Sequence, residues 1–397
     1  MNRIEKLIKE KCPNGVVFRS IGDCCNFQNG YAFKSNLFKP SGSILLRITN
    51  INGKEIDLTD VKYIDINDYK TNLQPFTVKY DEIVIAMSGA TTGKIGINKT
   101  KTPLYLNQRV GKITPKDSRL NNHFLYHILL SKTEYFYKLA GGGAQPNLST
   151  DAIKNTLIPV PPIEVQEEIV RILDQFGKLE AELEAELEAR KSQYEYYRKS
   201  LLNTGEELIK LKDIAHYSTD RINYTELNED NYVGVDNLLQ NKKGKTKSSH
   251  VPTTGTSTKF EIDDILIGNI RPYLRKIWIA DCMGGTNGDV LDIRINNSKL
   301  VNPKFIYYVL SSENFFEYNN SNSKGAKMPR GDKQAIMNYE FKIPTLEKQN
   351  CIVQILDKFD SLVNDIKEGI PAEIEARRKQ YEFYRNRLLN FEEVSYE

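Results

Sequence analysis

The chain contains two copies of one long sequence pattern. VPPIEVQEEIVRILDQF at 160–176 and IPTLEKQNCIVQILDKF at 343–359 match at a constant offset of 183 residues. ARKSQYEYYRKSLL at 189–202 matches ARRKQYEFYRNRLL at 376–389 at an offset of 187. Two extended matches in the same order indicate an internal duplication, and a duplication decides the architecture of a whole chain.

Each copy is expected to be a long helix. Apolar residues recur at three- and four-residue steps in both copies, which is the pattern of a coiled-coil seam. Pro161 and Pro344 stand just before the two helices, where a missing N–H costs little. About 40 residues of helix span roughly 60 Å. The plainest arrangement packs the two helices against each other, antiparallel.

The duplication extends into the sequence between the helices. YDEIVIAMSGATTGKIGI at 80–97 resembles IDDILIGNIRPYLRKIWIA at 262–280, and FLYHILLS at 124–131 resembles FIYYVLSS at 305–312. The predicted fold class is therefore α+β, with two α/β domains separated by two long antiparallel coiled-coil helices in a pseudo-two-fold repeat. RIEKLIKE at 3–10 is expected to be a short helix that docks where the second long helix ends. The predicted boundaries are 1–160, 161–204, 205–343 and 344–397.

Positive charge is concentrated in the first domain. Residues 1–162 carry 22 Lys and Arg against 13 Asp and Glu, a net charge of +9, although the whole chain has only +3. Residues 163–202 carry 6 against 10, a net charge of −4, and residues 203–332 balance at 17 against 17. A basic globular block beside an acidic helix favours a nucleic-acid partner for the globular part.

Several protein classes can be set aside. MNRIEKLIKEKCPNG has no apolar core, so we expect no signal peptide, and no apolar run approaches the roughly 18 residues of a membrane span. Five cysteines form no CxxC pair and the four histidines are scattered. These counts argue against a zinc site or a disulfide framework and fit a reducing cytoplasm.

Two segments superficially resemble catalytic motifs. Residues 88–95 resemble a phosphate loop, but three residues rather than four separate the glycines, and Ile95 replaces the Ser or Thr that would meet magnesium. Residues 330–332 with 340–342 loosely mimic a nuclease site without its second carboxylate. We find no methyltransferase motif, so we expect no catalytic, cofactor-binding or metal-binding residues in this chain.

The repeated PxxExQxxIVxILDxF and EARxxQYExYRxxLL segments resemble the two conserved helical regions of type I restriction-modification specificity subunits. The resemblance covers nearly the whole chain. It implies a subunit without catalytic activity, in which each of two target-recognition domains reads half of an asymmetric, bipartite site in double-stranded DNA. It also implies two modification subunits that bind S-adenosylmethionine for adenine methylation, and restriction subunits that use ATP and magnesium.

A protein that binds DNA sequence-specifically uses Lys or Arg to contact phosphates, and amide side chains or Arg to contact base edges. The loops of both domains supply such residues, although an ordinary loop hydrogen bond or surface charge explains each one equally well. The first domain offers Ser88, Thr91, Thr92, Lys94, Asn107, Gln108, Arg109, Gln145 and Asn147. The second domain offers Lys242, Lys243, Asn269, Arg271, Tyr273, Arg275, Lys276, Lys327 and Arg330.

The helices offer two further features. Equivalent faces, acidic and aromatic, are expected to bind the two modification subunits; they comprise Glu195, Tyr196, Arg198, Glu382, Phe383 and Arg385. LEAELEAELEAR at 179–190 contains three near-identical four-residue units. The resemblance suggests that such units vary in number and set the spacer between the half-sites, although a good helix also drifts toward this composition.

Two alternatives stay open at the level of sequence. One is an enzyme fused to its own reader, against which the missing motifs argue. The other is a coiled-coil scaffold that binds no DNA, against which the basic first domain and the amide-rich loops argue.

Overall fold

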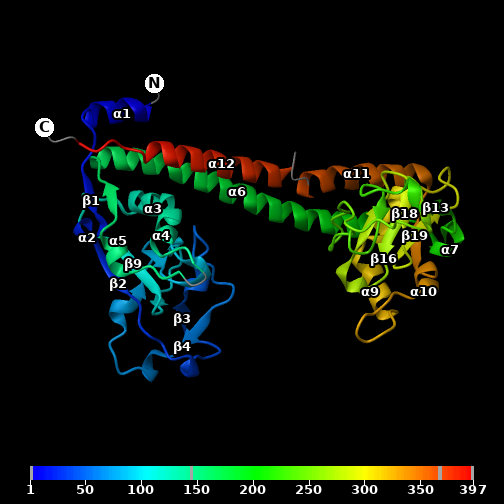
Figure 1. The fold of residues 1–397 in the computed structure, drawn as a ribbon, viewed down its shortest axis with the longest axis horizontal. Coiled ribbons are helices and arrows are strands. Elements are labelled where there is room, and N and C mark those ends of the chain that lie inside the picture. The colour runs from blue at the N-terminus through cyan, green and yellow to red at the C-terminus, as the bar shows by residue number, and fades with distance from the viewer. Residues whose placement is uncertain (1–2, 144–145, 365–368, 395–397) are drawn as a thin grey trace. The chain divides into compact units, whose positions relative to one another are not determined.

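The computed structural model describes residues 3–143, 146–364 and 369–394 (Figure 1). The chain divides into two compact units, residues 1–183 with 374–397 and residues 184–373. We call them the first and second units. The two predicted long helices each contribute one segment to both units.

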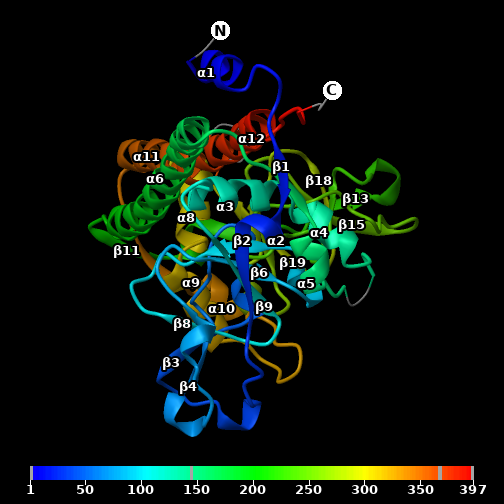
Figure 2. The ribbon, with the colours of Figure 1, turned by 90° about the vertical axis from the view of Figure 1, so that its left-hand side faces the viewer.

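The first unit is built on a four-stranded antiparallel sheet with strand order β2-β9-β6-β7 (Figure 2). Its strands are β2 (Cys25–Asn29), β9 (Val110–Pro115), β6 (Ile83–Ala86) and β7 (Ile95–Ile97). The continuous apolar run of β6 is fully buried because both faces of this strand are covered. A second sheet has the order β4-β3-β8-β5. It contains β4 (Lys62–Ile64), β3 (Ser43–Leu46), β8 (Leu104–Leu106) and β5 (Thr77–Val78).

Short helices complete the first unit. They are α2 (Ile21–Cys24), α3 (Asn122–Ser131), α4 (Thr133–Leu139) and α5 (Thr150–Lys154), and a two-stranded pair joins β1 (Phe18–Ser20) to β10 (Leu157–Pro159). Helix α3 begins where the Asn121 side chain accepts hydrogen bonds from the backbone N–H groups of His123 and Phe124. Its buried side chains, Phe124 and Leu125 among them, join the sheet in one core.

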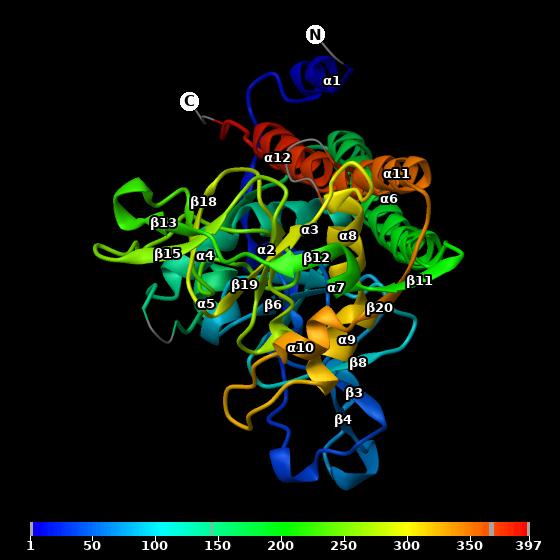
Figure 3. The same ribbon diagram turned by 90° about the vertical axis from the view of Figure 1, so that its right-hand side faces the viewer.

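The second unit, whose strands β12 and β19 are labelled in Figure 3, repeats the strand order of the central sheet of the first. The order β12-β19-β16-β17 corresponds to β2-β9-β6-β7, and these strands are β12 (Ala215–Tyr217), β19 (Val290–Ile295), β16 (Ile265–Gly268) and β17 (Ile277–Ile279). A second sheet contains β13 (Arg221–Asn223), β15 (Thr256–Phe260), β18 (Gly284–Thr286) and β14 (Tyr232–Val233). The remaining elements are β11 (Glu207–Lys210), β20 (Glu340–Ile343), α7 (Leu211–Ile214), α8 (Pro303–Leu310), α9 (Glu313–Ser321) and α10 (Lys333–Met337).

The first long helix, α6 (Ile163–Leu202), is continuous for 40 residues. The second copy forms α11 (Leu346–Asn364) and α12 (Ile370–Leu388), and residues 365–368 between them lie outside the described residues. Within the first unit, Phe176 stacks on Tyr384 with ring centroids 5.4 Å apart, and Glu180 pairs with Arg378 at 2.7 Å. Contacts that advance along α6 while they retreat along α12 confirm the predicted antiparallel packing in this unit.

A repeated glutamine ties each long helix to its sheet domain. Gln166 is fully buried; its Oε1 accepts from the backbone N–H of Asn121 at 2.8 Å, and its Nε2 donates to the carbonyl of Pro161 at 2.7 Å. Gln349 makes the same pair of bonds to Asn302 and Pro344, at 2.9 and 2.8 Å. Each glutamine therefore fixes the residue that caps α3 or α8.

The predicted N-terminal helix is present as α1 (Arg3–Lys11). Ile4 is 2% exposed and belongs to the core that contains Leu388, and Glu5 pairs with Arg387 at 2.7 Å. This confirms that the short helix docks where the second long helix ends. In the part of the chain that the structure describes, no helix is long and apolar enough to cross a membrane.

Candidate nucleic-acid interface

Three loops of the first unit meet at one end of its central sheet. The first follows β6 (residues 87–94), the second precedes β9 (residues 107–109), and the third precedes α5 (residues 146–148). The backbone N–H of Met87 donates to Arg109 O at 2.9 Å, and the N–H of Leu148 donates to Met87 O at 2.8 Å. Ser88 and Asn147 form an antiparallel bridge. We call this three-loop junction the first clasp.

The second unit forms the same junction, the second clasp, from residues 269–276, 287–289 and 324–331. The N–H of Asn269 donates to Asp289 O at 2.8 Å, and the N–H of Gly331 donates to Asn269 O at 3.1 Å. Ile270 and Arg330 form the bridge that corresponds to Ser88 and Asn147. The duplication therefore reaches individual backbone hydrogen bonds.

A repeated proline closes each clasp. Pro146 O accepts from the N–H of Gly89 at 3.2 Å, and Pro329 O accepts from the N–H of Arg271 at 2.7 Å. Gly89 and Arg271 both have positive φ values, 75° and 53°. A left-handed conformation costs a residue other than glycine roughly 1–2 kcal/mol, so the turn of the second clasp is held by its surroundings.

The structure brings most of the predicted first-domain residues together at the first clasp. Gln108, Arg109 and Asn147 are exposed there, and Asn107, Ser88 and Lys94 are half-buried. Arg109 Nη1 donates to Asn147 Oδ1 at 3.2 Å. Gln145 lies outside the described residues. Lys94 is followed directly by strand β7, whereas a phosphate loop would lead into a helix.

Two threonines of this loop serve the loop itself. Thr92 is 3% exposed, and its hydroxyl donates to Gly89 O at 2.7 Å. Thr91 donates to Ile48 O at 2.9 Å. The expectation that Thr92 presents its side chain to DNA is thus corrected, because burial leaves the hydroxyl no path to a ligand.

In the second clasp and the neighbouring loop, several predicted cations have internal partners. Arg275 forms a bidentate pair with Glu313, with Nη1–Oε1 at 2.8 Å and Nη2–Oε2 at 2.7 Å. Lys242 Nζ lies 3.4 Å from Glu313 Oε1, and Lys276 Nζ donates to Val235 O at 2.5 Å. Burial lowers the pKa of both lysines. These three cations therefore hold the loop in shape.

Other residues of the second clasp remain open to solvent. Arg271, Tyr273, Lys327 and Arg330 are exposed there, as is Lys243 in the neighbouring loop. Arg330 Nη2 lies 3.1 Å from Asp289 Oδ1. Asn269 is only 6% exposed, so the expectation that its amide meets a base edge is corrected in the same way. Contact with DNA stays a prediction for every exposed residue of both clasps.

The helical faces divide in a similar way. Tyr196 and Phe383, at equivalent positions of the repeat, are 71% and 61% exposed, and Glu195 and Glu382 beside them are exposed. Arg198 is only 5% exposed, because Nη2 donates to Tyr308 O on α8 and to Oγ of Ser311, the residue that follows α8. The expectation that Arg198 belongs to an exposed partner-binding face is corrected. Arg385, its equivalent, is half-buried with its guanidinium 5.3 Å from the Tyr381 ring centre.

Sequence reasoning missed the residues that build the clasps from within. Pro146, Pro329, Asp289 and Gly331 carry no polar motif that could have marked them as site residues. A Cβ on Gly331 would lie 2.6 Å from Asn319 Oδ1 and 2.8 Å from Asn269 Oδ1, so only glycine fits. An alignment of the two halves at Pro146 and Pro329 was the one available signal.

The duplicated sheet domains, each with one clasp, and the duplicated long helices are the architecture of one class of protein, the DNA specificity subunits. The family model for the type I restriction modification DNA specificity domain matches residues 13–189 and again residues 203–376. The chain therefore belongs to this family, whose members are specificity subunits without catalytic activity in type I restriction-modification enzymes.

Named relatives agree with this assignment. A type I restriction enzyme specificity subunit of Haemophilus influenzae is 29% identical, over 84% of this chain and 88% of the relative. The EcoR124I/EcoR124II specificity subunit of Escherichia coli is 30% identical, over 59% of this chain and 61% of the relative.

Solved structures share the fold. The type I restriction-modification S subunit of Mycoplasma genitalium covers 94% of this chain at a TM-score of 0.55, and the match covers 96% of that subunit at 15% identity. A chain from a structure concerned with complex assembly of the type I system covers 96% of this chain at a TM-score of 0.57. That match covers 99% of the solved chain, also at 15% identity.

Proposed function

We propose that this subunit reads a bipartite, asymmetric site in double-stranded DNA, one half-site with each clasp, across a spacer of fixed length. The observation that carries the proposal is the double occurrence of one backbone junction with different exposed side chains. Gly89 corresponds to Arg271 and Asn147 to Arg330 through equivalent backbone hydrogen bonds and bridges. Two clasps that share a backbone geometry but present different exposed side chains would recognise different half-sites, because side chains contact the base edges.

The subunit would direct adenine methylation and restriction by partner subunits in the cytoplasm. The exposed rings of Tyr196 and Phe383 support two equivalent docking faces, one for each of two modification subunits. S-adenosylmethionine would then bind to the modification subunits, and ATP with magnesium to the restriction subunits. Native mass spectrometry of the co-expressed complex tests this arrangement, and a single modification subunit per chain would contradict it.

Reading by two halves is tested with the assembled methyltransferase complex. Single-molecule methylome sequencing of a strain that expresses the complex should return one motif with two unlike half-sites and a constant gap. Gel-shift assays in graded salt should then show that altering either half-site weakens binding. Uniform affinity for all duplexes, or no affinity for any, would instead favour a scaffold that reads no sequence.

A further inference from the structure

Each clasp has one arginine that donates a hydrogen bond across the junction, but the two arginines come from different loops. In the first clasp, Arg109 donates across the junction to Asn147 Oδ1 at 3.2 Å. In the second clasp, Arg330 donates across the junction to Asp289 Oδ1 at 3.1 Å. Arg330 stands where the first clasp has Asn147, and Asp289 stands where the first clasp has Arg109.

Backbone contacts establish this correspondence without reference to the side chains. Asn147 and Arg330 each bridge the loop that follows the buried central strand, at Ser88 and Ile270. Arg109 O and Asp289 O each accept the N–H of the residue just after that strand, at 2.9 and 2.8 Å. The two pairs therefore occupy one site of the fold with donor and acceptor exchanged.

The exchange keeps what a base reader needs. Each guanidinium has a planar fork of five N–H donors, and its recorded bond to the partner oxygen uses only one terminal nitrogen. Both arginines are exposed, with Arg330 at 54% of its side chain. An arginine fork whose direction is set by a neighbouring oxygen matches the O6 and N7 acceptors of guanine in the major groove.

Nearby cations in the second clasp are less available for contact with a base, because their donor groups are engaged within the protein. Arg275 presents both ends of its fork to the carboxylate of Glu313, at 2.8 and 2.7 Å. Lys276 donates to Val235 O at 2.5 Å, inside the loop. The backbone of Arg330, by contrast, is fixed beside Gly331, where a larger residue would meet Asn319 and Asn269.

We propose that Arg109 and Arg330 are the specificity-determining residues at equivalent positions of the two half-sites, each reading one guanine-containing base pair. Asp289 is a positioning residue that aims the guanidinium of Arg330. This inference rests on the proposed function, because it assigns one base pair of each proposed half-site to a named side chain.

Competition binding by the assembled methyltransferase complex tests the assignment. The wild-type motif is first determined by methylome sequencing, and duplexes with each single base-pair change are then titrated against the complex. One bidentate pair discriminates by about 5- to 160-fold. R109A should abolish that discrimination at one base pair of one half-site, and R330A at one base pair of the other.

Charge-matched controls separate base reading from general attraction. Lys101 and Lys299 are exposed and lie beyond the opposite ends of the central sheets, after β7 and β19. K101A and K299A remove the same charge and should leave every preference between duplexes unchanged. Uniform weakening on all duplexes by R109A or R330A, with preferences intact, marks a phosphate contact and overturns the assignment.

Conservative and disruptive variants test the positioning role of Asp289. D289N replaces the carboxylate with an amide whose oxygen can still accept a hydrogen bond, as Asn147 Oδ1 does in the first clasp. This variant should retain the base preference that Arg330 confers. D289A should lose it several-fold at the same base pair. Equal retention of the preference by D289N and D289A would overturn the positioning role.

The outcome for the wild-type complex keeps the two proposals apart. If that complex shows no two-part motif, the proposed function fails before any variant is measured. If it shows a two-part motif that R109A and R330A leave unchanged at every base pair, only the assignment of the two arginines fails. Exposed side chains make misfolding of the variants a minor concern, and thermal melts of each variant check it.

Discussion

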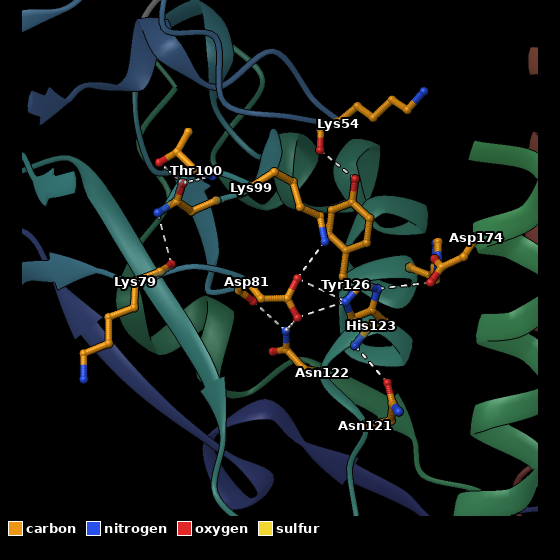
Figure 4. A network of polar contacts seen from close by, with 12 residues as sticks. Lys54, Lys79, Asp81, Lys99, Thr100, Asn121, Asn122, His123, Tyr126 and Asp174 are labelled. Carbon is orange, nitrogen blue, oxygen red and sulfur yellow. Dashed lines mark hydrogen bonds and ion pairs between the residues drawn. The ribbon is translucent and has the colours of Figure 1, made fainter. Parts of the chain in front are cut away.

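Two histidines of α3, His123 and His127, contact Asp174 on α6. Figure 4 shows His123 between Asp81 and Asp174. These contacts predict that the packing of α3 against α6 in the first unit depends on pH. His127 Nε2 lies 2.9 Å from Asp174 Oδ1, and His127 Nδ1 lies 3.0 Å from the Tyr381 hydroxyl. Because a carboxylate only accepts, His127 carries its proton on Nε2, and Nδ1 accepts from Tyr381. His127 is thereby satisfied as a neutral ring, and burial lowers its pKa.

His123 is the charged histidine of the two. Its Nδ1 lies 3.2 Å from Asp174 Oδ2 and its Nε2 lies 2.9 Å from Asp81 Oδ2, so both ring nitrogens face carboxylates and both need protons. The hydrogen bond to Asp174 raises the pKa of His123. Burial alone would raise the pKa of Asp174, but the hydrogen bonds from His123 and His127 outweigh it and the net shift is downward.

The second unit forms the equivalent contacts without histidine. Asp357, the repeat equivalent of Asp174, accepts from Lys304 Nζ at 2.8 Å and from the Tyr308 hydroxyl at 2.5 Å. Burial raises the pKa of Tyr308, so its hydroxyl stays protonated at neutral pH. Neither partner of Asp357 is a histidine, the side chain whose unperturbed charge change falls between about pH 5 and 8. D357A is therefore a matched control for D174A.

We expect D174A to destabilise the first unit by about 2 kcal/mol at pH 8. One hydrogen bond to a charged group contributes about 1.5–3 kcal/mol, and the 44% exposure of Asp174 lets water replace part of it. A histidine whose pKa is higher in the folded state than in the unfolded state stabilises the fold. This stabilisation is fully present below the unfolded-state pKa of about 6.5 and is lost as the pH rises through the folded-state pKa. The penalty of D174A should therefore grow by up to about 1 kcal/mol at pH 6, where His123 is charged.

Hydrogen–deuterium exchange measures this locally. Peptides covering residues 122–131 and 303–310 report the opening of α3 and α8, and comparison with wild type at the same pH cancels the intrinsic exchange rate. D174A should expose the first peptide more at pH 6 than at pH 8, whereas D357A should expose the second peptide equally at both. Equal D174A penalties at both values, or a pH-dependent D357A penalty, would refute the reasoning.

Three further outcomes are expected. Arg275→Ala should lower the free energy of unfolding of the second unit by about 0.5–1 kcal/mol in urea titrations, because its part-exposed pair with Glu313 is lost, while base preferences stay unchanged. Inserting one four-residue unit after residue 186 lengthens α6 by about 6 Å and turns it by a net 40° or so. Methylome sequencing should then show the spacer longer by one base pair, or at most two, with both half-sites intact. Tyr196→Ala combined with Phe383→Ala should reduce the number of bound modification subunits in native mass spectrometry, with DNA binding by the free chain retained.

The sequence was sufficient for the architecture because the duplication is long and periodic. Matching segments at two offsets placed both long helices and the repeated sheet domain, whereas the short α1 was predicted from RIEKLIKE at 3–10, which lies outside these matches. The repeated glutamines were visible as matched letters, but their role was not. A side chain such as Gln166 acquires its function only when Asn121 and Pro161 are brought beside it by the tertiary fold.

The candidate site was predicted as a set of loops and less well as a set of side chains. Polar composition selected loops of the first half that the structure joins at the first clasp. In the second half it selected residues 269–276 and 327–330, which belong to the second clasp, and residues 242–243, which lie in a neighbouring loop, but it missed residues 287–289. Composition could not reveal that Arg275 faces Glu313 or that Arg198 faces α8, because both partners lie far away in sequence. Partners and burial that exist only in the folded chain are the physical reason for these corrections.

The two clasps also separate what the fold requires from what the side chains add. Gly93 and Arg275 stand at equivalent ends of the turn, with φ values of 82° and 53°, and so do Gly89 and Arg271 at its start. The backbone therefore takes a left-handed conformation at these places whichever residue is present, at a cost of roughly 1–2 kcal/mol for each arginine. Arg275 offsets that cost through Glu313, whereas the exposed Arg271 has a side chain directed at solvent. Glycine would relieve the strain at Arg271, so we expect R271G to stabilise the second unit in urea titrations and to weaken DNA binding by the assembled complex. Stabilisation without any loss of binding would show that the arginine at this place serves neither the fold nor the reading of DNA.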